Sequence, residues 1–241
     1  MKTLFRFVCI FIVALSIVPV FSNADAVVAE WKLNEGSGNV AYDNTGNGAD
    51  LALDFGTGSW VGGAFNFTGS QRFALDRSAN TYFDLSQDFT FSATINASPA
   101  GGTQIIFSTN EGENYYLGTR CFGILNGTLF FEAPGLAGMY YGSQPVLDGR
   151  VHDVMVEFIA STGTVTTYVD GIFDNQSSAF GGMAGTPDFY TFHLGSNLYI
   201  DDYGLYQPFV GTMSNVTISQ IPEPTTLVLL GMGILGFLRK R

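Results

Sequence analysis

The stretch DGRVHDVMVEFIASTGTVTTYVDG, residues 148–171, gives the clearest indication of the fold. Every second position carries an apolar residue or threonine in two successive runs: Val154, Val156 and Phe158, then Val165, Thr167 and Val169. A period of two is that of a β-strand, in which alternate side chains share a face. Ser-Thr-Gly supplies a tight turn between the runs, and Asp170-Gly171 offers a second turn. Residues 152–176 therefore predict a meander of three antiparallel strands.

The rest of the central region has the same character. DFTFSATINA, residues 88–97, places Phe89, Phe91, Ala93 and Ile95 on one face and polar residues on the other. Short runs of β-branched and aromatic residues recur between turns that contain Gly or Asn, which is typical of an all-β sandwich. No segment offers an amphipathic helix of three turns. Further strands are expected at 27–33, 64–67, 72–75, 104–108, 123–125, 128–132, 192–195 and 209–218.

The N-terminus has the order of a secretory signal peptide, predicted at residues 1–26. Lys2 and Arg6 come first, an apolar stretch covers 7–21, and small residues with two cleavage sites follow. The alternative, a retained membrane helix, is disfavoured by Pro19 and by the small residues at the exit.

Without this segment and the tail from 221 onward, residues 27–220 suit one domain with a substantial core. This region has five basic and nineteen acidic residues, so five minus nineteen gives a formal charge of −14. Such a surface repels phosphate backbones, which excludes nucleic acid as a partner and suits calcium or neutral sugars better. Cys121 is the one cysteine in the region, which excludes a disulfide framework. We interpret it as a small apolar residue of a strand rather than a nucleophile.

Five segments in order resemble the laminin-G-like, or concanavalin A-like, jelly-roll domains of bacterial surface and secreted proteins. They are EWKLNEGSGNVAYDNTGNGADL (30–51), GGAFNFTG (62–69), FTFSATI (89–95), the meander segment (148–171) and GTMSNVTIS (211–219). The resemblance implies a jelly-roll sandwich of two antiparallel sheets over residues 27–220. This fold class agrees with the strand pattern.

Relatives of this fold include glycoside hydrolases, which carry out catalysis with acidic side chains. The hydrolases that cleave β-glucans carry Glu-x-Asp-x-x-Glu on one strand, and this sequence has no such triplet. The acids at 111–114 have the wrong spacing, and Asp201 and Asp202 would point to opposite faces of a strand. His152 and His193, the two histidines, lack the spacing of zinc ligands, and there is no nucleophile elbow. We interpret the protein as non-catalytic.

A calcium site is one candidate in the loop YDNTGNGAD. Its oxygen ligands would come from Asp43, Asn47 and Asp50. In the resembling domains the Asp matched by Asp43 often helps to hold calcium, but a second carboxylate position is Ser214 here, which lowers the expected affinity. The alternative is that Asp43 and Asn44 cap a turn through side-chain hydrogen bonds.

A sugar site is the second candidate, in LGSNLYIDDYGLYQPF. This segment contains aromatic side chains, which can stack on a pyranose ring, next to carboxylates, which can bind the hydroxyls of the sugar. The predicted ligand residues are Tyr199, Asp201, Asp202, Tyr203 and Tyr206. The alternative is that these tyrosines pack into the sandwich with their hydroxyls in water.

The C-terminal tail carries the most specific motif. A Pro-Glu-Pro triplet precedes twelve apolar residues, 227–238, which would span about 18 Å as a helix against about 30 Å of hydrocarbon. The tail, predicted as a short transmembrane-type helix, resembles the PEP-CTERM sorting signal of Gram-negative bacteria. Its residues are Pro222, Glu223 and Pro224, then Arg239, Lys240 and Arg241. The resemblance implies an exosortase-type partner, transient inner-membrane association, and then a cell-surface or extracellular location.

Two functional hypotheses are therefore favoured over an enzyme. The first is an exported binding module for extracellular polysaccharide or another surface component. The alternative is a structural matrix protein without a discrete ligand.

Overall fold

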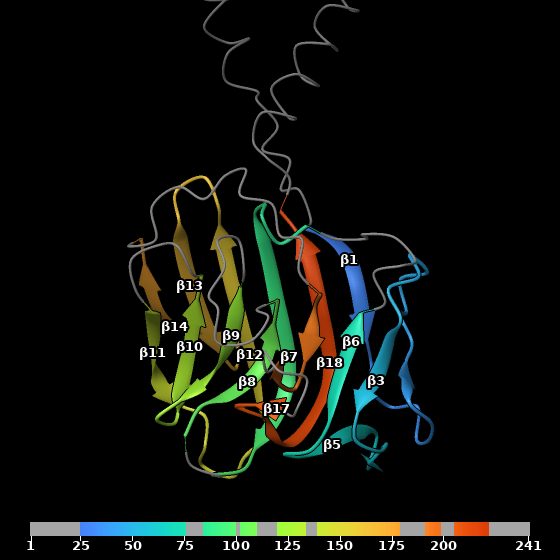
Figure 1. Ribbon diagram of the computed structural model, residues 1–241. Helices are drawn as coiled ribbons and strands as arrows, with labels where there is room; N and C mark the ends of the chain where they lie inside the picture. The colour runs from blue at the N-terminus through green and yellow to red at the C-terminus, as the bar shows by residue number, and fades with distance from the viewer. Residues whose placement is uncertain are drawn as a thin grey trace, which may run out of the picture.

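Figure 1 shows the computed structural model of the chain. The structure describes residues 25–75, 84–99, 102–109, 120–133, 139–178, 191–198 and 205–221. Within these ranges the chain forms strands and no helix, and no helix there is long and apolar enough to cross a membrane. The predicted signal peptide up to residue 24 and the sorting-signal residues Pro222, Glu223, Pro224, Arg239, Lys240 and Arg241 lie outside the described residues.

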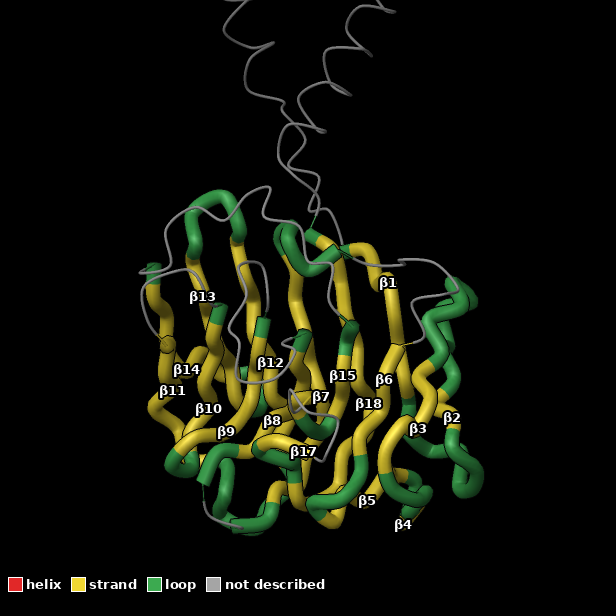
Figure 2. The backbone as a smooth tube through the Cα atoms, in the orientation of Figure 1, coloured by secondary structure: helices red, strands yellow, loops and turns green. Residues whose placement is uncertain are grey.

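Two antiparallel sheets stack face to face (Figures 1 and 2). The first sheet has the order β14 (Ile172–Ser177), β13 (Thr164–Val169), β12 (His152–Ile159), β7 (Phe89–Ala97), β18 (Val210–Gln220), β5 (Ala64–Thr68), β4 (Trp60–Val61), and β1 (Ala26–Trp31) also pairs with β18. The second sheet has the order β11 (Met139–Pro145), β10 (Thr128–Glu132), β9 (Cys121–Leu125), β8 (Gln104–Ser108), β15 (His193–Leu194), β6 (Arg72–Leu75), β3 (Leu51–Phe55), β2 (Val40–Ala41). A separate hairpin joins β16 (Asn197–Leu198) to β17 (Leu205–Tyr206).

The predicted meander is confirmed as β12, β13 and β14. Its second turn uses Asp170 at φ 53° and Gly171 at φ 72°, the pair of positive φ angles that the tightest hairpin turn requires. Val154 lies opposite Val169 in this register, so the apolar positions of neighbouring strands meet on the core face.

Aromatic side chains fill the space between the sheets. Phe91 of the first sheet lies 4.5 Å from Phe107 of the second, measured between ring centroids. Phe192 stacks on both Phe107 and Trp31, at 5.7 and 5.6 Å. The indole nitrogen of Trp31 donates to the Ala49 carbonyl at 2.7 Å, so the one polar atom of this ring is satisfied in the core.

Residues 26–68 contribute β1 to β5 to the same two sheets as the rest of the described domain. Ala26 at the start of β1 lies opposite Gln220 at the end of β18. The two ends of the described domain therefore leave from the same end of the sandwich.

Candidate functional site

The carboxylate of Asp43 holds together the turn in which a calcium site was predicted. Its Oδ1 accepts hydrogen bonds from the backbone N–H groups of Glu30 and Thr45, each at 3.1 Å. Its Oδ2 accepts from the Thr45 hydroxyl at 2.7 Å and from the Ala49 N–H at 3.2 Å. Burial raises the pKa of this carboxyl, but the hydrogen bonds from Thr45, Glu30 and Ala49 outweigh burial and lower it below its usual value.

The same turn covers the free edge of β1. The Asn44 N–H donates to the Glu30 carbonyl at 2.8 Å, and the Asn47 side-chain amide donates to the Val28 carbonyl at 2.9 Å. These bonds occupy groups that an exposed edge strand would offer to another chain.

The contacts of Asp43 are those of the capped-turn alternative, and Asp50 joins them by accepting from the Asp43 N–H at 2.8 Å. The described residues contain no cluster of three or more His, Cys, Asp or Glu side chains placed to hold a metal ion. Calcium binding by Asp43, Asn47 and Asp50 stays a prediction.

A row of polar side chains crosses the outer face of the second sheet, opposite the core. The register places His193 opposite Ser108, Ser108 opposite Cys121, and Cys121 opposite Glu132. Directly opposed residues on one face have Cβ atoms about 5 Å apart. Their neighbours along the strands, such as Phe107, belong to the main core. Sequence reasoning missed this row because it depends on the pairing of four strands that are distant in the chain.

The row is poorly suited to nucleophilic catalysis. Burial, and then the charge of Glu132, raise the pKa of the Cys121 thiol well above its usual value, so the thiol stays protonated. His193 lies two strands from Cys121, about 10 Å away at the usual strand spacing, which is beyond hydrogen-bond reach. Burial also raises the pKa of Glu132.

The hairpin of β16 and β17 is attached beside this row. The Ser108 hydroxyl donates to the side-chain oxygen of Asn197 at 3.0 Å, and the Ile105 N–H donates to the Gln207 carbonyl at 2.9 Å. Tyr206 pairs with Asn197 in the hairpin. The other predicted ligand residues, Tyr199, Asp201, Asp202 and Tyr203, lie outside the described residues.

His152 is held between two carboxylates at the base of the β12–β13 hairpin. Its Nδ1 lies 2.9 Å from Asp170 Oδ2, and its Nε2 lies 3.0 Å from Asp148 Oδ1. Burial lowers the pKa of His152, but the two carboxylates outweigh burial and raise it above its usual value. The carboxylates occupy both ring nitrogens, which makes this a structural clamp.

Comparisons with known proteins agree with the architecture. The sequence profile of the concanavalin A-like lectin/glucanases superfamily (Laminin_G_3) matches residues 67–222, and that of the PEP-CTERM protein-sorting motif matches residues 220–241. A search of curated protein sequences found no match.

Several solved structures share the fold. The binding domain of botulinum neurotoxin serotype D/C superimposes with a TM-score of 0.58 at 12% identity, over 86% of this chain and 52% of that one. Trypanosoma rangeli sialidase with the inhibitor DANA superimposes with a TM-score of 0.59 at 17% sequence identity, over 88% of this chain and 34% of the sialidase. A third structure is domain 4 of AbnA, an extracellular GH43 arabinanase from Geobacillus stearothermophilus, in complex with arabinotriose. It superimposes with a TM-score of 0.52 at 16% sequence identity, over 84% of this chain and 97% of that domain.

At these identities the likeness shows the fold alone, and the chain spans about half of the neurotoxin domain and about a third of the sialidase. The C-terminal motif indicates a secreted protein that is sorted by an exosortase-type system. The profile match covers more than half of the chain, and the two stacked sheets agree with it. The chain belongs to the concanavalin A-like lectin/glucanases superfamily.

Proposed function

We propose that this protein is an exported, non-catalytic module that binds extracellular polysaccharide through the β16–β17 hairpin. The observation that carries the proposal is the attachment of this hairpin to the outer face of the second sheet by the Ser108–Asn197 hydrogen bond. A rigid sheet thereby supports the segment that contains the predicted aromatic and carboxylate ligands, and binding loops commonly lie on such scaffolds. The sorting motif supports an extracellular location, and the signal peptide at 1–26 is part of the proposal.

The non-catalytic part of the proposal rests on the chemistry of the polar row. Hydrolysis by a retaining glycosidase needs two carboxyl groups about 5 Å apart. In the row formed by His193, Ser108, Cys121 and Glu132, Glu132 supplies one carboxyl group and its neighbour is a protonated thiol. A row of this kind can order a hairpin above it by hydrogen bonding and lacks the paired acids for glycoside cleavage.

A glycan array tests the function. The purified protein is applied in calcium and in chelator, beside a Tyr199→Ala/Tyr203→Ala variant and a Tyr42→Ala control, since Tyr42 is exposed and lies in the Asp43 turn. We expect wild type and the control to bind a polysaccharide with the same affinity and the hairpin variant to bind it more weakly. Binding that vanishes in chelator would also support the calcium site. No binding to any glycan, with an unchanged melting temperature in chelator, would favour the structural matrix protein instead.

A further inference from the structure

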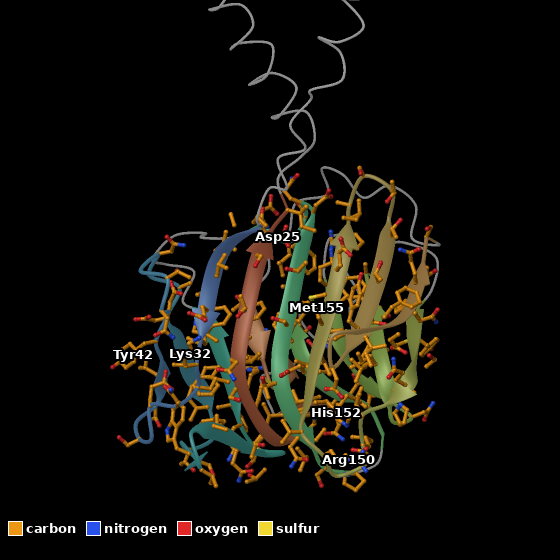
Figure 3. The ribbon with its side chains drawn as sticks, turned by 180° about the vertical axis from the view of Figure 1, so that it is seen from behind. Asp25, Lys32, Tyr42, Arg150, His152 and Met155 are labelled. Atoms are coloured by element: carbon orange, nitrogen blue, oxygen red, sulfur yellow. The ribbon has the colours of Figure 1, made fainter. Side chains whose placement is uncertain are left out.

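Figure 3 shows the outer face of the first sheet, which lies on the opposite side of the sandwich from the hairpin. Most side chains in the two rows described below are polar or aromatic and at least partly exposed, while Thr166 and Ser219 are buried. Met155, labelled near the middle of this face, belongs to a row that runs across six strands. Successive partners in the row are Phe173, Tyr168, Met155, Ser92, Thr217 and Glu30. A neighbouring row contains Gln176, Thr166, Glu157, Thr90 and Ser219. We name these two rows the outer-face rows.

One end of the outer-face rows is aromatic and open to solvent. Phe173 in the edge strand β14 is 56% exposed, although phenylalanine is usually buried. The ring of Tyr168 meets it edge to face at 6.2 Å and supports it. An exposed, supported aromatic ring is what stacks on the apolar face of a sugar.

Hydrogen-bonding groups surround this aromatic end. Burial, and then the charge of the nearby Glu157 carboxylate, raise the pKa of Tyr168. The amide of the exposed Gln176 donates to the Thr166 hydroxyl at 3.0 Å. Farther along the rows, hydroxyls of Ser92 and its neighbours continue the pattern across the central strands. Hydroxyls and amides both donate and accept, as the hydroxyls of a sugar do.

The charge of this region favours a neutral ligand. Among the described residues, the basic side chains near the face are Lys32, which pairs with Glu30, and Arg150, which pairs with Asp148. Glu157 and Asp153 add negative charge. An anionic polymer would therefore meet repulsion, and the described cations near this face are already paired with carboxylates.

We propose that the outer-face rows are a second polysaccharide-binding surface, specific for a neutral glycan, with Phe173 and Tyr168 as the stacking platform and Glu157 and Gln176 as hydrogen-bonding groups. This surface goes beyond the hairpin site and does not depend on it. A second copy of the chain fits less well, because a two-fold contact would bring the carboxylates of both copies together around small polar side chains that bury little apolar area.

If the hairpin site of the proposed function also holds, the two surfaces lie on opposite sides of the sandwich. One molecule would then bind two polymer chains at once, which raises avidity and cross-links them. This consequence connects the binding and the matrix interpretations of the protein.

The experiment compares four forms of the full protein by affinity electrophoresis in gels that contain a neutral arabinan, a neutral glucan or an anionic alginate. The forms are wild type, Phe173→Ala, Ile172→Ala as the matched control, and the Tyr199→Ala/Tyr203→Ala hairpin variant. Ile172 is the adjacent residue, 63% exposed and not aromatic. Both β14 side chains are mostly exposed, so we expect folded proteins with unchanged melting temperatures.

We expect Phe173→Ala to weaken binding of a neutral polymer about tenfold, with Ile172→Ala near wild type and no retardation by alginate. If only the hairpin variant loses binding of the neutral polymer, the second surface is overturned and the proposed function stands. If only Phe173→Ala loses it, the hairpin site of the proposed function is overturned and the second surface stands. Retardation of no form by either neutral polymer overturns both. A dimer of wild type in solution that Phe173→Ala dissociates would identify the rows as a contact between copies and overturn the glycan surface.

Discussion

The carboxylate of Asp174 in β14 accepts two hydrogen bonds from Ser143 in β11, one from the backbone N–H and one from the hydroxyl, each at 2.8 Å. These strands are the edges of different sheets. The same carboxylate accepts from the Gln144 N–H at 2.8 Å and from the Thr167 hydroxyl at 3.0 Å. One nearly buried side chain thus joins the two sheets along an edge where no backbone ladder connects them.

Replacing this carboxylate should destabilise the sandwich. Asp174→Ala leaves the donors of Ser143, Gln144 and Thr167 without their acceptor in a half-buried edge, and we expect the free energy of unfolding to fall by about 3 kcal/mol. Denaturant unfolding measures it. Asp174→Asn keeps one acceptor oxygen and should lose less. Equal stability of wild type and Asp174→Ala would contradict the role of this side chain.

The strand β11 marks the limit of what the sequence predicts. The meander was predictable because its period and its Asp-Gly turn are local. Residues 139–145, MYYGSQP, carry Gly and Pro and show no clean alternation, so the strand was missed. It forms because β10 and Asp174 supply partners from elsewhere in the chain. Strand pairing of this kind overrides weak local preference.

The candidate sites show the same limit. The loop around Asp43 was identified by its Gly, Asn and Asp content, but its role at the edge of β1 requires knowing which strand passes beside it. The row from His193 to Glu132 depends on the register of several distant strands. A one-residue change in register would turn these side chains into the core. The nearly continuous burial of β8 and β9 shows no alternation from which the register could be predicted.

The clamp around His152 predicts a pH-dependent stability. Because the pKa of His152 is higher in the folded protein than its unfolded value of 6.5, protonated His152 stabilises the fold fully at pH values below 6.5. This contribution is lost as the pH rises through the folded pKa. The hydrogen bonds from His152 lower the pKa values of Asp148 and Asp170 below 3.8, and their contribution is lost as pH falls through those lower values.

Both contributions are therefore present between about pH 4 and pH 6.5, where we expect the clamp to be strongest. Thermal unfolding at half-unit steps from pH 5 to pH 9 measures the decline on the alkaline side. In the His152→Asn variant, the part of the alkaline decline in thermal stability that comes from the titration of His152 should disappear. A wild-type profile identical in shape to that of the variant would show that the clamp does not titrate in this range.

The turn around Asp43 predicts a second loss of stability. Asp43→Ala removes the acceptor of the Glu30, Thr45 and Ala49 N–H groups, so we expect about 2 kcal/mol of destabilisation in calcium and in chelator alike. Differential scanning calorimetry in both buffers measures it. Destabilisation of the variant that appears only in calcium, together with a wild-type melting temperature raised by calcium, would instead assign the carboxylate to the metal.

The Cys121 thiol should be unreactive in the folded protein. It is 3% exposed and its pKa is raised well above the usual value by burial and by Glu132, so neither access nor thiolate is available to an alkylating reagent. Treatment with iodoacetamide at pH 8, followed by peptide mass spectrometry, should leave Cys121 unmodified in buffer and modify it fully in denaturant. Modification of Cys121 in buffer at the denatured rate would mean that the outer face of the second sheet opens to solvent, and the structural reading of this thiol would be wrong.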